Sequence, residues 1–110
     1  MDIGTLRKLV ALDETDPLSR FALGNKLFEE SNDDRAMLEE AATHLSFANS
    51  HARDHLATYH VYAKTLIALG KSTEAVAVLA EGIERVAAGG GGMGRDLGPA
   101  MQELLESLRQ

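Results

Sequence analysis

The sequence predicts an all-α fold of antiparallel helix-turn-helix units, and three observations lead to this prediction. Apolar residues recur three and four positions apart in six segments, and no segment shows the period of two that is typical of strands. Gly, Pro and short runs of Asp, Asn and Ser separate these segments. The chain has 110 residues, of which 45% are hydrophobic, so we expect one domain over residues 1–110.

The breaks between segments carry the residues that begin and end helices. Asp16 is a candidate N-cap, and Pro17 would then occupy the first helical position. Gly70 can adopt the left-handed conformation that closes a helix, and Ser72 can cap the helix that follows. The run "ESNDD" marks a further turn. The expected helices cover residues 3–12, 17–29, 34–50, 55–69, 73–88 and 96–109, with a Gly-rich linker at 89–95.

Two consecutive helices in the second half of the chain form a recognisable unit. The segment "TYHVYAKTLIALGKSTEAVAVLAEGI" contains a helix, a Gly turn and a second helix in which small Ala75 precedes large Leu79. A small residue lets two helices approach closely, and a large one fills the space beside it. This segment resembles the tetratricopeptide repeat (TPR) family, whose unit is a helix-turn-helix of 34 residues. The matching positions are Tyr59, Tyr62, Ala63, Leu66, Gly70, Glu74, Ala75, Val76 and Leu79.

A first unit precedes it, with Leu23, Gly24 and Leu27 at the spacing of the same family and Ala41 in its second helix. The step from Gly24 to Ala41 is longer than in the family, and Arg53 stands where a unit usually closes with Pro. Because each unit stacks its apolar face on a neighbour, the terminal helices are expected to act as caps. The layout resembles small stand-alone bacterial proteins with two such units: an N-terminal helix at 3–12, repeats at 17–50 and 55–88, the 89–95 linker and a C-terminal capping helix at 96–109.

Composition argues against several classes of function. The net charge of −6 disfavours a nucleic-acid partner, and the chain has no Cys to form a disulfide, a thiolate zinc site or a cysteine nucleophile. The longest apolar run, "AVAVLA", is too short to cross a bilayer, and "MDIGTLRKLV" lacks the features of a signal peptide. We therefore expect a cytoplasmic protein without a membrane partner. No arrangement typical of a nucleophilic enzyme is visible, so neither an enzyme nor a cofactor is expected.

All four histidines, His44, His51, His55 and His60, lie within one short stretch. His51 and His55 are four residues apart, which on one helix would suit a zinc ion. However, the repeat pattern predicts a turn at 51–54, which would place these two residues on different helices. The dipole at a helix C-terminus also favours a histidine such as His51. Solvated helix-end histidines are the favoured interpretation, and a metal-binding cluster is the alternative.

Two other biased segments have similarly simple interpretations. The run "GGGGMGRD" lacks the Lys and Ser/Thr of a phosphate-binding loop and follows a helix rather than a strand, which favours a linker. The acidic stretch 29–40 lacks the Gly that an EF-hand needs at its sharp turn. We expect this stretch to form a solvated helix face.

The TPR resemblance implies that the first helix of each unit lines a concave surface that binds an extended peptide or a helix. Asn25 and Lys64 resemble part of the clamp with which chaperone-binding members hold a C-terminal carboxylate, although the other basic residues of that clamp are missing. We therefore expect a protein–protein interaction or scaffold module whose partner is acidic or has a free carboxylate. The alternatives are a self-associating structural module and a surface filled by the terminal helices. The expected binding residues, here called the helix A surface, are Phe21, Asn25, Phe28, His60, Lys64 and Ile67.

Overall fold

The computed structural model describes residues 1–89 and 96–110, and these residues form α-helices and no strand. The predicted all-α fold is therefore confirmed, and the observed helix ends agree with the predicted ones to within about one residue. Most of the predicted Gly-rich linker, residues 90–95, lies outside the described residues. The six helices of the described residues are α1 (Ile3–Leu12), α2 (Pro17–Glu30), α3 (Arg35–His51), α4 (Leu56–Ala68), α5 (Ser72–Ala87) and α6 (Leu97–Leu108).

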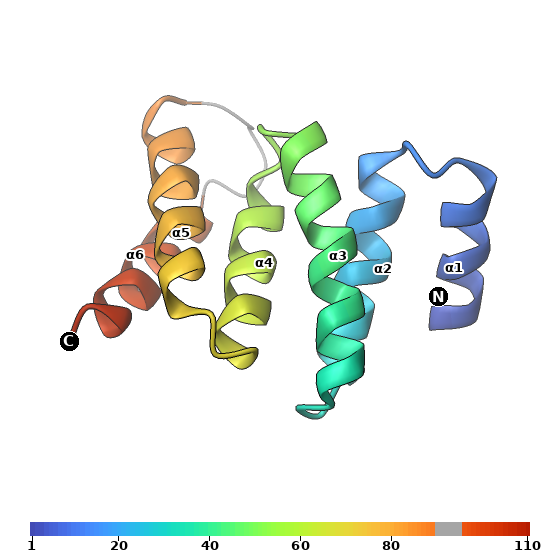
Figure 1. Ribbon diagram of the computed structural model, residues 1–110. Helices are drawn as coiled ribbons and strands as arrows, with labels where there is room; N and C mark the ends of the chain where they lie inside the picture. The colour runs from blue at the N-terminus through green and yellow to red at the C-terminus, as the bar shows by residue number, and fades with distance from the viewer. Residues whose placement is uncertain (90–95) are drawn as a thin grey trace.

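The helices stand side by side in a row, with the two chain ends at opposite ends of it (Figure 1). Each helix packs against the next one along the chain. In addition, α4 contacts both α2 and α6. In the part of the chain that the structure describes, no Cα atom of α3 lies within 8 Å of one in α5, and the same is true of α2 and α6. The even-numbered helices therefore form one continuous layer, and α6 extends that layer beside α4 without covering α2.

Aspartate side chains begin the first three helices. Asp2, Asp16 and Asp34 each accept a hydrogen bond from a backbone N–H in the first turn of α1, α2 and α3. Pro17 occupies the first turn of α2, as predicted. The turn between α2 and α3 uses two consecutive left-handed residues at Asn32 and Asp33, with φ of 45° and 64°. Asn and Asp tolerate this conformation better than other side chains, so the predicted break at 30–34 is confirmed.

The turn between α4 and α5 confirms one predicted residue and corrects another. Gly70 has the predicted left-handed conformation, with φ of 78°. The Lys71 N–H donates to the carbonyl of Leu66 at 2.8 Å, and the Gly70 N–H donates to that of Ile67 at 2.9 Å. These bonds close α4 so tightly that Lys71 becomes the N-cap of α5, without a side-chain hydrogen bond. The prediction that Ser72 caps this helix was wrong, because Ser72 is already its first residue.

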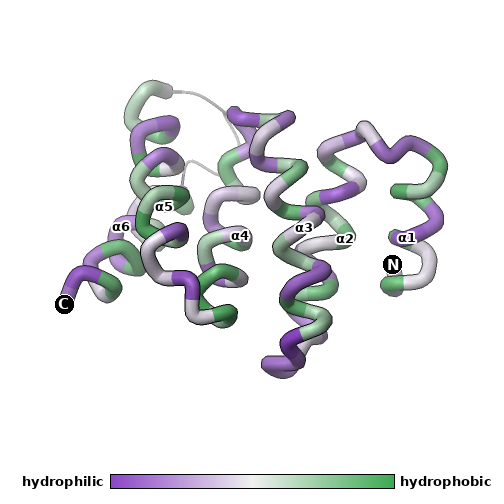
Figure 2. Tube along the Cα trace, viewed as in Figure 1, coloured by the Kyte–Doolittle hydropathy of each residue, from purple (hydrophilic) through white to green (hydrophobic). Residues whose placement is uncertain are grey.

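Two apolar clusters form most of the core, and α4 contributes to both. Along each helix, hydrophobic and hydrophilic stretches alternate (Figure 2), so each helix has an apolar side to bury. Ala41 and Ala75 are fully buried, as expected for close helix contacts. The N-terminal cluster contains Leu6, Val10, Leu23, Leu27, Ala41, Leu45 and Val61. The C-terminal cluster contains Tyr59, Ala63, Leu79, Met101 and Leu105.

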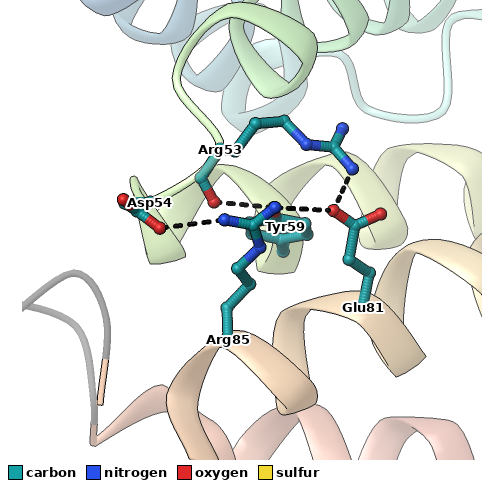
Figure 3. A network of polar contacts seen from close by, with 5 residues as sticks. All are labelled: Arg53, Asp54, Tyr59, Glu81 and Arg85. Atoms are coloured by element: carbon teal, nitrogen blue, oxygen red, sulfur yellow. Dashed lines mark hydrogen bonds and ion pairs between the residues drawn. The ribbon is translucent and has the colours of Figure 1, made fainter. Parts of the chain in front are cut away.

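A polar network holds the turn between α3 and α4 against α5 (Figure 3). The buried Tyr59 hydroxyl donates to the carbonyl oxygen of Arg53 at 2.7 Å and lies 3.2 Å from Oε2 of Glu81. The guanidinium groups of Arg53 and Arg85 both reach Glu81, and Nη1 of Arg85 donates to Asp54 at 3.0 Å. Arg53 thus holds the turn between α3 and α4 in place through both its side chain and its carbonyl.

Among the described helices, none combines the length and the apolar character that crossing a membrane requires.

Candidate functional site

The helix A surface lies on the layer formed by α2, α4 and α6. His60, Lys64 and Ile67 follow each other at helical spacing on α4, and all three side chains are half-buried. Phe28, also half-buried, lies on the neighbouring α2. Because α2 contacts α4 and α4 contacts α6, side chains from all three helices meet in this layer. Two hollows open there.

The first hollow, called the α2–α4 hollow, lies where both helices end and has a volume of about 390 Å³. Lys64 enters it from α4, and its Nζ atom lies 5.4 Å from the centroid of the Phe28 ring. At this distance the ammonium is attracted by the ring face. The lining combines apolar side chains with two carboxylates, and it consists of Phe28, Glu29, Ser31, Asn32, Asp33, Leu38, Lys64, Ile67 and Ala68.

The second hollow, called the α4–α6 hollow, has a volume of about 270 Å³ and is again lined by Lys64. His60 lies beside Lys64 on α4, and Glu103 is the one acidic residue that α6 contributes to the lining. Burial lowers the pKa of His60, and the positive charge of Lys64 lowers it further. His60 is therefore largely neutral at neutral pH, which leaves Lys64 as the cation of this hollow. The lining is completed by Ala100, Leu104 and Ser107.

Lys64 is thus common to both hollows, and it forms no ion pair with any residue in 1–89 or 96–110. Lys26 of α2, by contrast, pairs with Glu30 at 3.0 Å. A half-buried ammonium without a carboxylate partner has donors free for a ligand, because Lys carries three N–H groups. Its charge therefore makes Lys64 the main determinant of what this layer can bind.

Two predicted members of the helix A surface lie outside these hollows. Phe21 packs against the N-terminal cluster, and its ring meets the His55 ring edge-on with centroids 4.7 Å apart. Asn25 is half-buried on α2 and lines neither hollow. Of the six predicted residues, the structure brings Phe28, Lys64 and Ile67 together in one hollow and Lys64 with His60 in the other.

A larger hollow, of about 600 Å³, lies between α3 and α5 and was not predicted. It lies where the backbones of α3 and α5 stay apart, and it is also lined by Tyr62 and Leu66 of α4 and by Leu69, the C-cap of that helix. Sequence periodicity identifies the buried face of a helix, but it does not show the gap between two helices that share a neighbour. No sequence signal therefore pointed to this hollow. Its walls carry Glu39, Ala42, Thr43, Ser46, Lys71 and Glu74.

The histidine-rich stretch is divided by the predicted turn. His51 is the last residue of α3, where its ring stacks on Phe47 with centroids 4.0 Å apart. His55 is the N-cap of α4, and its Nδ1 atom lies 2.7 Å from the Thr58 hydroxyl. The two residues therefore do not share a helix face. In residues 1–89 and 96–110, no three His, Asp or Glu side chains gather in a way that could hold a metal ion.

Comparison of the chain with models of protein families, with curated proteins and with solved structures found no match.

Proposed function

We propose that this chain is a protein-binding module that holds an extended segment or a helix of a partner on the layer formed by α2, α4 and α6. The observation that carries the proposal is the position of Lys64. This residue lines both hollows of the layer and has no ion-pair partner among the described residues. A ligand that crosses α4 would place one group on Lys64 and a neighbouring group in each hollow.

The chemistry of the two hollows suggests the kind of ligand. Lys64 favours a carboxylate, which can be an acidic side chain or the end of a chain, because charge-assisted hydrogen bonds are the stronger ones. Apolar side chains on either side of that carboxylate would contact Phe28 and Ile67 in one hollow and Leu104 in the other. A protein of net charge −6 repels acidic ligands elsewhere, so binding should depend strongly on Lys64 and weaken as salt is added.

The TPR resemblance supports the same surface, since members of that family bind peptides on the first helix of each unit. The position of α6 supports it too, because this helix lies beside α4 and leaves α2 uncovered. The proposed role is binding alone, without catalysis and without a cofactor. The proposed location is the cytoplasm. Self-association on the same surface is the alternative, in which the bound segment comes from a second copy.

The proposal is tested by capturing partners from the native lysate with the wild type, Lys64→Met and the control Lys71→Met. Lys71 is exposed and lines the hollow between α3 and α5, so its replacement removes the same charge from a different face. We expect Lys64→Met to lose the captured protein and Lys71→Met to retain it. The minimal bound peptide should then lose affinity when its carboxylate is amidated and when salt is raised. Equal capture by both variants would exclude the helix A surface.

A further inference from the structure

A chain of polar contacts at the N-terminal end of the row links α1, the turn after it, α2 and α3. It lies apart from the two hollows described above. Its members are Arg7, Arg20, Glu40, His44 and Phe47. His44 is the central member, since it lies between Arg20 and Glu40 and its side chain is only 15% exposed.

Arg20 makes three contacts from α2. Its Nε atom donates to the carbonyl oxygen of Glu14, in the turn between α1 and α2, at 2.9 Å. Its guanidinium carbon lies 4.3 Å from the centroid of the Phe47 ring. Its Nη1 atom lies 3.5 Å from Nδ1 of His44. Because a guanidinium can only donate, Nδ1 must be the unprotonated acceptor, which requires a neutral imidazole.

Glu40 makes the second connection. Its carboxylate accepts two hydrogen bonds from Arg7 of α1, at 2.8 and 3.2 Å, which ties α1 to α3. The same carboxylate lies 3.6 Å from Nε2 of His44, one turn further along α3. His44 therefore touches one member of each polar contact that holds the N-terminal segment: Arg20, which holds the turn after α1 to α2, and Glu40, which holds α1 to α3.

We propose that His44 is a proton-operated switch for the attachment of α1 and the turn after it. When neutral, His44 accepts the hydrogen bond of Arg20 at Nδ1 and presents an uncharged N–H at Nε2 to Glu40. When protonated, it repels the Arg20 guanidinium and competes with Arg7 for Glu40. Acidification thus weakens both polar contacts, and α1 then depends more on its apolar contacts, chiefly those of Leu6 and Val10.

The charged groups around His44 give the direction of this switch. Burial is the main factor that lowers the His44 pKa from its ordinary value of 6.5, and Arg20 lowers it further, with a smaller contribution from Arg7. Glu40 acts in the opposite direction without reversing the shift. A histidine with a lowered pKa binds its proton more weakly while the segment is docked. Docking is therefore fully favoured above pH 6.5 and weakens as the pH falls through that value towards the lowered pKa.

The switch is tested by amide hydrogen exchange of α1, compared with α5 in the same sample, at pH 7.5 and 5.5 after correction for intrinsic rates. In the wild type, we expect acidification to lower the protection of the α1 amides more than that of the α5 amides. The ratio of the two should change by up to about tenfold for each unit by which the His44 pKa differs between the docked and the detached states. In His44→Gln, whose amide can accept from Arg20 and donate to Glu40 at any pH, this fall should disappear. The control His60→Gln should keep it.

A second variant makes the result independent of how well His44→Gln folds. Replacement of Arg20 by Gln removes the positive charge that faces Nδ1, so the His44 pKa measured by NMR should rise. Protection of α1 should already be reduced at pH 7.5 in this variant, since the contact with the Glu14 carbonyl is lost. The proposal is overturned if α1 of the wild type keeps its relative protection at pH 5.5, if His44→Gln shows the wild-type fall, or if Arg20→Gln leaves the His44 pKa unchanged.

Discussion

Single residues decide how closely the helices approach, and Gly24 shows this most clearly. A Cβ atom built on Gly24 would lie 2.6 Å from Cγ of Leu45 and 3.2 Å from the carbonyl oxygen of Ala41. The first distance is far below a normal contact, and Cγ of Leu45 is close to its own backbone and has little freedom to move. α2 and α3 can therefore pack at their observed distance only because residue 24 has no side chain.

We predict that Gly24→Ala destabilises the protein, even though Ala is the better helix former. Overpacking a core costs about 1–3 kcal/mol, whereas the gain in helix propensity is at most about 1 kcal/mol. The free energy of unfolding, measured in urea, should therefore decrease. The control is Gly4→Ala in α1, where the added Cβ meets its nearest atom at 3.6 Å and should be neutral or stabilising. Equal stabilisation by both changes would mean that the contact between α2 and α3 is looser than described.

At the scale of helices and turns, the junction between α3 and α4 depends more on a buried hydroxyl than on its exposed ion pairs. The Tyr59 side chain is fully buried and its hydroxyl has two acceptors. By contrast, the side chain of Asp54, which pairs with Arg85, is 71% exposed. Solvent screens exposed pairs, so the pair between Arg85 and Asp54 contributes little on its own.

We predict that Tyr59→Phe lowers the free energy of unfolding by about 1 kcal/mol, because the Arg53 carbonyl loses its donor inside the junction. Asp54→Asn should lower it by only about 0.3 kcal/mol, the value of an exposed pair. Chemical unfolding of the two variants beside the wild type gives both numbers. If Asp54→Asn lowers the free energy of unfolding more than Tyr59→Phe does, the ion pairs, and not the hydroxyl, hold the turn.

The elements were predictable where one residue determines the local backbone. Asp16 with Pro17 and Gly70 each specify a helix end through their own chemistry, and the structure agrees at these positions. Ser72 failed as a cap because the hydrogen bonds that close α4 leave only Lys71 between the helices. That arrangement depends on how two elements join, which the preference of a single residue does not describe.

For the whole molecule, the two apolar clusters imply two regions of local stability that meet at α4. The N-terminal cluster draws its members from α1 to α4, and the C-terminal cluster draws its members from α4 to α6. Met101 of α6 is fully buried in the second cluster, and its sulfur would lie 2.9 Å from a Cβ on Gly82. In a row of helices, each unit is stabilised mainly by its neighbours.

We therefore predict that Met101→Ala, which should cost about 2–5 kcal/mol, acts mainly on one half of the row. Amide exchange should speed up in α5 and α6 more than in α2 and α3. The matched variant Leu27→Ala, in the N-terminal cluster, should show the opposite pattern. Uniform acceleration in both halves of either variant would indicate a single cooperative unit.

Only part of the candidate site could be predicted from the sequence. Helical spacing and the family resemblance together placed His60, Lys64 and Ile67 on one face of α4, and these residues do line the hollows. Asn25 and Phe21 follow the same spacing on α2, but the tilt of one helix on another determines which side chains reach a hollow. The Phe21 ring turns to His55 instead. The contributions of Leu38, Glu103 and Leu104 come from other helices, and only the packing reveals them.

The placement of the two chain ends at opposite ends of the row also has a mechanical consequence (Figure 1). Tension applied to the two ends acts across the helices, roughly perpendicular to their axes. Contacts between neighbouring helices then separate one after another, and they do not have to break all at once. Detachment begins at α1 or α6, the two end members of the row, and each residue released adds about 3.5 Å of chain. The molecule should therefore extend in small steps at low force.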